Sequence, residues 1–199
     1  MSDGLSLSLA DALQQRRSGR VFSGSAPLDR EILVEILRAM QRVTGAEGRR
    51  TAPSAGGLHT LKLRVAVQGC SGISDGGHEY DSVSGTVSAC PGGETTPRQI
   101  QSCCVGPSEW VAAAPAVILV AGRFAPLREA FGDQAPTGRC DRYLWLEAGC
   151  VLQNGGLAAA ALGASACIVG GFDDDRIAAL FGLAAPDMPL ALLALGMPG

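Results

Sequence analysis

The chain has 199 residues and a net charge of −3, with 47% hydrophobic and only 18% charged residues. This length predicts a single domain, residues 1–199, that can bury a full core without disulfides or metals. The acidic balance excludes a protein that binds nucleic acid nonspecifically, because such binding needs a strongly basic surface. Lys62 is the only lysine, so any phosphate contact here would come from arginine.

The seven cysteines indicate a reduced, cytoplasmic protein. Their number is odd, no pair has the CxxC spacing, and no signal-peptide pattern opens the chain. Neither His59 nor His78 lies in a ligand-like group with cysteines, so we expect no metal site. The uncharged stretch 148–171 is interrupted by Gln153, Asn154 and glycines. It therefore predicts a buried helix and strand instead of a membrane span.

The first third of the chain predicts two helices and a strand. Residues 8–17 read as a short helix, and Asp29 can cap a second helix that runs to about Gln41. That second helix has its apolar residues at helical spacing: Ile32, Leu33, Ile36, Leu37 and Met40. Residues 61–67 alternate between apolar and other side chains, which is the period of a strand.

Residues 69–109 are rich in Gly, Ser, Thr and Pro, and predict a variable polar loop or lid, with a weak hairpin at 78–81 and 85–87. Regular structure resumes with a strand at 116–121 and a long helix from Asp141 to about Leu162. A buried strand at 167–169, a helix capped by Asp173 and stopped by Gly182, and a strand at 190–195 follow. Interleaved helices and strands indicate an α/β or α+β protein.

Two segments in the first third could hold a ligand. Residues 16–20 (RRSGR) carry three guanidiniums and a hydroxyl, which suits an anion, although cations also favour the C-terminal end of a helix. Residues 53–57 (PSAGG) have little side-chain bulk, so a planar ligand could approach the backbone, but a plain turn has the same composition. No GK[ST] sequence follows this loop, so it is not a Walker loop.

Two later segments have the same ambiguity. The long helix contains Glu147, Gln153 and Asn154 among apolar and small residues, and these groups need partners, either on a ligand or on the backbone. Residues 169–174 (VGGFDD) place a glycine pair before a helix, where free N–H groups could face an electron-rich ring or simply form a turn.

Taken in order, these four segments resemble the nitroreductase superfamily, and within it the SagB-type dehydrogenases related to McbC. The family's patterns RRSxRxF, RxxPSaGg, RYxxLEAGxxxQN and VGGFDD are matched by residues 16–22, 50–57, 142–154 and 169–174. The similarity extends from about Leu9 to Pro198, and it is weakest over residues 69–109.

The resemblance implies an α+β fold, with a central antiparallel-rich sheet wrapped by helices and FMN at a homodimer interface. By this resemblance, the phosphate and ribityl end of FMN would be held by Arg16, Arg17, Ser18 and Arg20. The isoalloxazine ring would pack against Pro53, Ser54, Ala55 and Gly56 of the partner chain. Val169, Gly170 and Gly171 would lie near the N5 side of the flavin, and Gln153 would be a further contact.

The implied activity is hydride transfer through flavin N5 to or from a small organic substrate, with NADH or NADPH as an electron donor. A SagB-type dehydrogenation of a peptide azoline is the alternative. The stretch 126–132 lacks the Lys-Tyr pair of that group, and Glu129, Tyr143 and Tyr80 are substitute candidates for a catalytic base. A flavin-binding or partner subunit without turnover is an alternative of another class.

Overall fold

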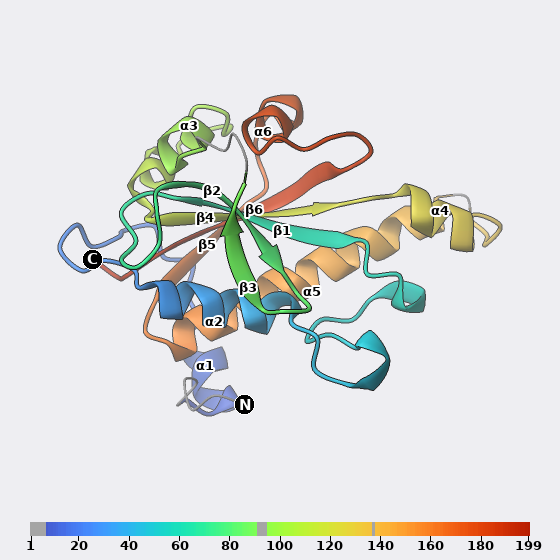
Figure 1. Ribbon diagram of the computed structural model, residues 1–199, viewed down its shortest axis with the longest axis horizontal. Coiled ribbons are helices and arrows are strands. Elements are labelled where there is room, and N and C mark those ends of the chain that lie inside the picture. The colour runs from blue at the N-terminus through green and yellow to red at the C-terminus, as the bar shows by residue number, and fades with distance from the viewer. Residues whose placement is uncertain (1–6, 91–94, 137) are drawn as a thin grey trace.

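The computed structural model describes residues 7–90, 95–136 and 138–199. Its centre is a six-stranded sheet of order β3-β2-β1-β4-β6-β5, in which every neighbouring pair is antiparallel (Figure 1). The strands are β1 (Leu61–Val67), β2 (Gly76–Asp81), β3 (Thr86–Ala89), β4 (Ala116–Gly122), β5 (Ser165–Val169) and β6 (Met188–Gly196).

Helices cover both faces of this sheet. Helices α2 and α5 lie along one face, and α3 and α6 lie on the other, so the molecule has three layers (Figure 1). The helices are α1 (Leu9–Gln15), α2 (Arg30–Gln41), α3 (Pro97–Gln101), α4 (Ala125–Phe131), α5 (Arg139–Ala161) and α6 (Asp174–Leu180).

The central strand β4 shows why both faces need a cover. All seven of its residues are buried. Because side chains alternate along a strand, Ile118 and Val120 enter the core beneath α2 and α5, while Val117 and Leu119 enter the core beneath α3 and α6. A strand that is apolar on both faces is stable only between two layers.

Close packing of α2 on α5 depends on one glycine. A Cβ atom at Gly155 would lie 2.8 Å from Cδ2 of Leu193 and 3.0 Å from the Met40 side chain. The absence of a side chain at this position therefore lets α5 approach both α2 and β6.

The expected helices and strands outside residues 69–109 are present, but the cap expected at Asp141 is wrong. Asp29 is the N-cap residue of α2 as expected, but its carboxylate makes no capping bond and accepts a hydrogen bond from the Ser71 hydroxyl. Helix α5 begins at Arg139 after Gly138 (φ +81°), so Asp141 lies inside its first turn. There the Asp141 carboxylate pairs with the Arg128 guanidinium at 2.7 Å.

Residues 69–109 differ from the irregular loop that their composition predicts. The weak hairpin forms two strands, β2 and β3, at one edge of the sheet. Thr96 and Gln99 form a capping box that starts α3, and Ile100 of that helix is fully buried. Residues 91–94 lie outside the described part, and a lid function of this segment stays a prediction.

The fold class is confirmed as α+β with an antiparallel sheet wrapped by helices. Within the described residues, no helix is long and apolar enough to cross a membrane. All seven cysteines are free thiols, and the described part holds no group of three or more metal-ligating side chains.

Candidate functional site

The arginine tract, residues 16–20, lies against the start of β5. Ser18 forms a bridge to Ala166, and the Gly19 N–H donates to the Ala166 carbonyl at 3.1 Å. A Cβ atom at Gly19 would lie 2.8 Å from the Ser165 Oγ, so the approach requires glycine. A cavity of about 190 Å³ lies here, lined by Arg17, Gly19, the start of β5 and the C-terminal part of α5.

The three guanidiniums of this tract have no acidic partner among the described residues. The Arg17 side chain donates to the carbonyls of Gln14 (2.6 Å) and Arg16 (2.9 Å) at the end of α1, which is the ordinary role of a cation there. The Arg20 guanidinium lies over the Trp110 ring, 5.7 Å from its centre. The tract therefore carries positive charge that no carboxylate within these residues neutralises.

Strand β5 leads from the arginine tract to the glycine pair Gly170 and Gly171. The four steps from Ala166 to Gly170 span about 13 Å at the rise of a strand. A Cβ atom at Gly170 would meet nothing within 4 Å, and among the described residues neither glycine N–H has a hydrogen-bond acceptor. The Asp173 carboxylate instead caps α6 by accepting the Arg176 N–H at 3.0 Å. The Gly171 carbonyl accepts the Val105 N–H at 2.8 Å, so the open part of the pair is the Gly170 backbone and the two N–H groups.

Glu147 holds the 53–57 loop from inside α5. Its side chain is buried (the residue is 5% exposed), and its Oε1 accepts the Ala55 N–H at 2.6 Å. Burial raises the pKa of Glu147, while hydrogen bonds from the Ala55 N–H and the Ser54 hydroxyl act in the opposite direction. The Ser54 Oγ also accepts the His59 N–H at 2.9 Å. One buried carboxylate therefore organises the loop.

The polar groups of α5 thus bond mainly to the backbone. The Asn154 amide donates to the Thr51 carbonyl at 3.2 Å. Asn154 and Glu147 therefore both find their partners on the backbone. Gln153 differs: it is exposed and has no hydrogen-bond partner within the described residues. It lies on the outer side of α5, and its predicted flavin contact stays a prediction.

The 53–57 loop also needs its glycines. Gly56 and Gly57 have φ values of +59° and +67°, which favour glycine. A cavity of about 500 Å³ opens beside the loop, with a wall that includes Pro53, Ser54, Arg50 and His59. Sequence reasoning assigned no role to the last two, although Arg50 stands three residues before Pro53 in the matched pattern.

The three candidate bases are not brought together. The Tyr143 hydroxyl donates to the Gln134 Oε1 at 2.8 Å, and Glu129 is exposed on α4. Tyr80 lies on β2, where burial raises its pKa to about 12. None of these groups lies in a shared site, and their catalytic roles stay predictions.

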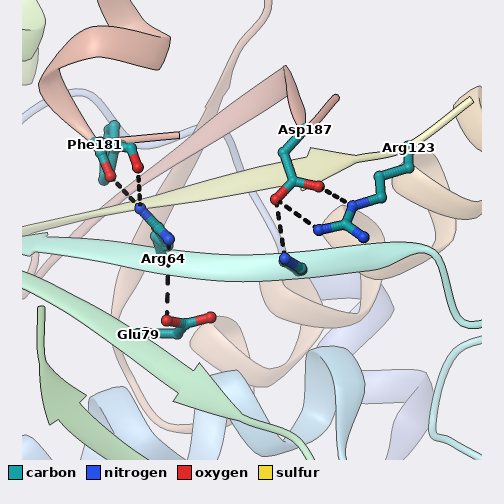
Figure 2. A network of polar contacts seen from close by, with 7 residues as sticks. Arg64, Glu79, Arg123, Phe181 and Asp187 are labelled. Carbon is teal, nitrogen blue, oxygen red and sulfur yellow. Dashed lines mark hydrogen bonds and ion pairs between the residues drawn. The ribbon is translucent and has the colours of Figure 1, made fainter. Parts of the chain in front are cut away.

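A separate polar network fixes the loop between α6 and β6 to the sheet (Figure 2). Lys62 (2.9 Å) and Arg123 both bond to the Asp187 carboxylate, which is 6% exposed. Burial would raise the pKa of Asp187, but these two bonds hold it below its ordinary value. Arg64 donates to the carbonyls of Phe181 and Gly182 at the end of α6. Lys62, the only lysine of the chain, therefore has a structural role.

The family model described as the nitroreductase family matches residues 13–197. The chain belongs to the nitroreductase family. It is 31% identical to a candidate nitroreductase of Methanocaldococcus jannaschii over 194 residues, which covers 96% of this chain and 91% of that one. The nitroreductase fold and an oxidoreductase class follow from this membership.

Solved structures agree with this fold. A candidate nitroreductase from Ralstonia eutropha has a TM-score of 0.80 at 23% identity, covering all of this chain and 86% of that one. A chain of the Escherichia coli microcin synthetase McbBCD complex, solved with truncated pro-MccB17 bound, has a TM-score of 0.72 at 18% identity over all of this chain and 76% of that one. At these identities, the likeness shows the shared nitroreductase fold.

Proposed function

We propose that this nitroreductase-family protein is an FMN-dependent oxidoreductase that transfers hydride to or from a small organic substrate. The observation that carries the proposal is the strip along β5. One end holds three guanidiniums without an acidic partner in the described residues, and the other end holds the N–H groups of Gly170 and Gly171, which have no acceptor there. This arrangement suits an elongated ligand with an anionic end and a flat, polar end.

The residues fit FMN in chemistry and in order. Arg16, Arg17, Ser18 and Arg20 would hold the phosphate and the ribityl hydroxyls, because guanidinium groups match phosphate geometry. The backbone of residues 169–171 would supply N–H donors to the ring. When bound, FMN supplies the hydride-accepting and hydride-donating chemistry, and the protein supplies position and electrostatics.

A homodimer would complete this site. The side of α5 that faces solvent carries Trp145 (53% exposed) and Leu146 (59% exposed), followed at helical spacing by Gly149, Cys150 and Gln153. Large exposed apolar side chains on one helix face support a self-complementary contact between two copies. Because Glu147 ties the 53–57 loop to this helix, Pro53, Ser54, Ala55 and Gly56 would approach the flavin of the partner.

The cofactor proposal is tested by the visible spectrum of the purified protein, with and without added FMN, followed by anaerobic mixing with NADH and NADPH. Flavin bands that bleach with a nicotinamide support the reductase. Replacing Arg20 with Gln should weaken FMN binding, whereas Arg49→Gln, an exposed change outside the tract, should not. A protein that binds no flavin after FMN is added would rule out the proposal and favour a partner subunit without turnover.

Sedimentation of wild type and Leu146→Arg tests the dimer. The variant should be monomeric, while Val83→Arg, at a 76% exposed position in the β2–β3 turn, should sediment as wild type. Equal sedimentation of Leu146→Arg and wild type would place the contact elsewhere.

A SagB-type dehydrogenase is the second candidate, favoured by the fold shared with the microcin synthetase chain. Helix α4, which occupies the region of the missing Lys-Tyr pair, contains neither residue. Flavin bands that resist both nicotinamides but bleach with a peptide azoline would select this candidate. The two candidates therefore differ in the reductant that the flavin accepts.

A further inference from the structure

A second cavity of about 360 Å³ adjoins the one beside the 53–57 loop. It lies at the end of the β1–β2 pair, where Leu61, Lys62 and Tyr80 contribute to its wall. Arg50 and His59 line both cavities, so the two spaces meet at these residues. None of the residues assigned above to flavin binding lines this second cavity.

Arg50 is held at this junction without a partner for its charge. The backbone bridge between Val43 and Arg50 closes the turn after α2 and directs the chain toward the 53–57 loop. The Nε of Arg50 is buried and has no hydrogen-bond acceptor, and no carboxylate of the described residues lies within ion-pair distance of its guanidinium. Arginine remains charged in proteins and can only donate, so what this site lacks is an acceptor.

Tyr80 adds a second donor without a partner. The residue is 5% exposed, and its buried hydroxyl has no hydrogen-bond partner among the described residues. Burial raises the pKa of Tyr80 to about 12, so the phenol stays protonated at neutral pH. Arg38 and Arg42 lie close enough to interact electrostatically with this hydroxyl, as does Glu35, which pairs with Arg38 at 2.6 Å.

The acids on this cavity are engaged elsewhere. Asp81 interacts with Arg50 at longer range, but its carboxylate accepts the Val83 N–H and the Ser84 hydroxyl, both at 2.8 Å, in its own turn. Glu79 faces Arg64 at 3.9 Å. Lys62 is likewise committed to Asp187. No carboxylate of the described chain therefore supplies the acceptor that Arg50 and Tyr80 lack.

His59 connects this polar end to the loop. Its φ of +50° is unusual for a residue other than glycine, and its N–H is held by the Ser54 hydroxyl. Burial and the nearby Arg50 lower the pKa of His59, so the ring is neutral at neutral pH. A neutral imidazole adds no repulsion to the cavity and offers one donor and one acceptor.

We propose that this second cavity binds the carboxylate group of an organic acid substrate, with Arg50 and Tyr80 as its hydrogen-bond donors. The rest of the substrate would extend past His59 into the cavity of the 53–57 loop. This inference rests on the proposed function for the reacting end of the substrate, and on the two unpartnered donors for its anionic end.

Calorimetric binding of 4-nitrobenzoate and of 4-nitrobenzyl alcohol, to protein with and without FMN, tests the inference separately from turnover. We expect Arg50→Met to weaken 4-nitrobenzoate binding by about 10- to 100-fold, as loss of a hydrogen bond to a charged group predicts. Tyr80→Phe should weaken it by about 3- to 10-fold, and binding of the alcohol should change with neither substitution. Arg98→Met, at an exposed position on α3 that lines neither cavity, is the matched control.

Circular dichroism of each variant shows whether its fold is intact, and Arg50→Lys, which keeps the charge but removes Nε, should bind between wild type and Arg50→Met. If the protein turns over nitro compounds, the loss should appear in KM and not in kcat, because the carboxylate lies away from the reacting atoms. Equal 4-nitrobenzoate affinity in wild type, Arg50→Met and Arg98→Met would overturn the inference. An equal loss of affinity for 4-nitrobenzoate and 4-nitrobenzyl alcohol in Arg50→Met would also overturn it, since the second cavity would then not recognise the carboxylate charge. Neither result depends on flavin reduction.

Discussion

The contact between Glu147 and Ala55 gives a sharp prediction, because one buried carboxylate accepts the hydrogen bonds that hold the loop. Glu147→Ala removes the acceptor of the Ala55 N–H and of the Ser54 hydroxyl. Leaving a buried donor unsatisfied costs roughly 1–3 kcal/mol. The Ser54 hydroxyl can rotate toward another acceptor, so we expect a loss of about 2 kcal/mol in unfolding free energy, dominated by the amide.

Glu147→Gln separates the acceptor from the charge. Glutamine keeps an oxygen at the same place, so its cost should stay below about 1 kcal/mol, the net value of a neutral hydrogen bond. The pH dependence has a definite sign. The pKa of Glu147 is raised above its ordinary 4.5, so between these values the folded state binds more protons than the unfolded state. Stability therefore falls as pH rises through that window, and the glutamine variant lacks this contribution.

Urea unfolding followed by tryptophan fluorescence, at one protein concentration and at several pH values from 4.5 to 8, measures both effects. Wild type should gain stability relative to Glu147→Gln on acidification. An equal loss in Glu147→Gln and Glu147→Ala at pH 7 would refute the reasoning, because the charge and not the acceptor would then hold the loop.

Three further substitutions or labels test other parts of the structure. Gly155→Val should cost about 2 kcal/mol by overpacking against Leu193, and should lower Tm by about 4–8 °C in calorimetry. Gly24→Ala, where a Cβ meets nothing within 4 Å, should not lower it. Asp187→Asn should make the free energy of unfolding less dependent on pH below 3.8. The lowered pKa of Asp187 stabilises the folded state above pH 3.8, and this stabilisation is lost as the pH falls through the pKa of the folded protein. An unchanged acid transition in the variant would contradict this. Maleimide should label the exposed Cys150 more slowly in wild type than in Leu146→Arg if α5 forms the dimer contact, and equal rates would count against it.

Local pattern predicted the helices and strands whose periodicity is strong. The spacing of Leu33, Ile36 and Met40 in α2 and the alternation in β1 both arise from one buried face, which the sequence shows directly. The Asp141 cap was wrong because a competing partner, Arg128, belongs to α4, which the sequence analysis did not identify as a helix. The hairpin β2–β3 was only weakly indicated, since its edge position leaves β3 largely exposed.

The candidate site shows the same division. The order of the four segments led to the prediction of which stretches would hold a ligand. It could not show the contacts within the site, because the residues that touch lie far apart along the chain. Glu147 meets Ala55 across 92 positions, and Ser18 meets Ala166 across 148 positions. Arg50 and Tyr80 line one cavity although 30 positions separate them, and no short motif contains that proximity. The flavin-binding and catalytic assignments stay predictions.

The strand order has a consequence for how the site is made. Strand β6 is the last in sequence, yet it lies between β4 and β5, so β5 has no neighbouring strand in the sheet until residues 188–196 insert. The arginine tract packs against β5, so it can reach its final position only after β6 has paired with β5. Such distant pairings must overcome the entropy of closing long loops before they gain contacts, which makes them slow. During synthesis, the two ends of the proposed flavin strip therefore assemble late, after nearly the whole domain has been made.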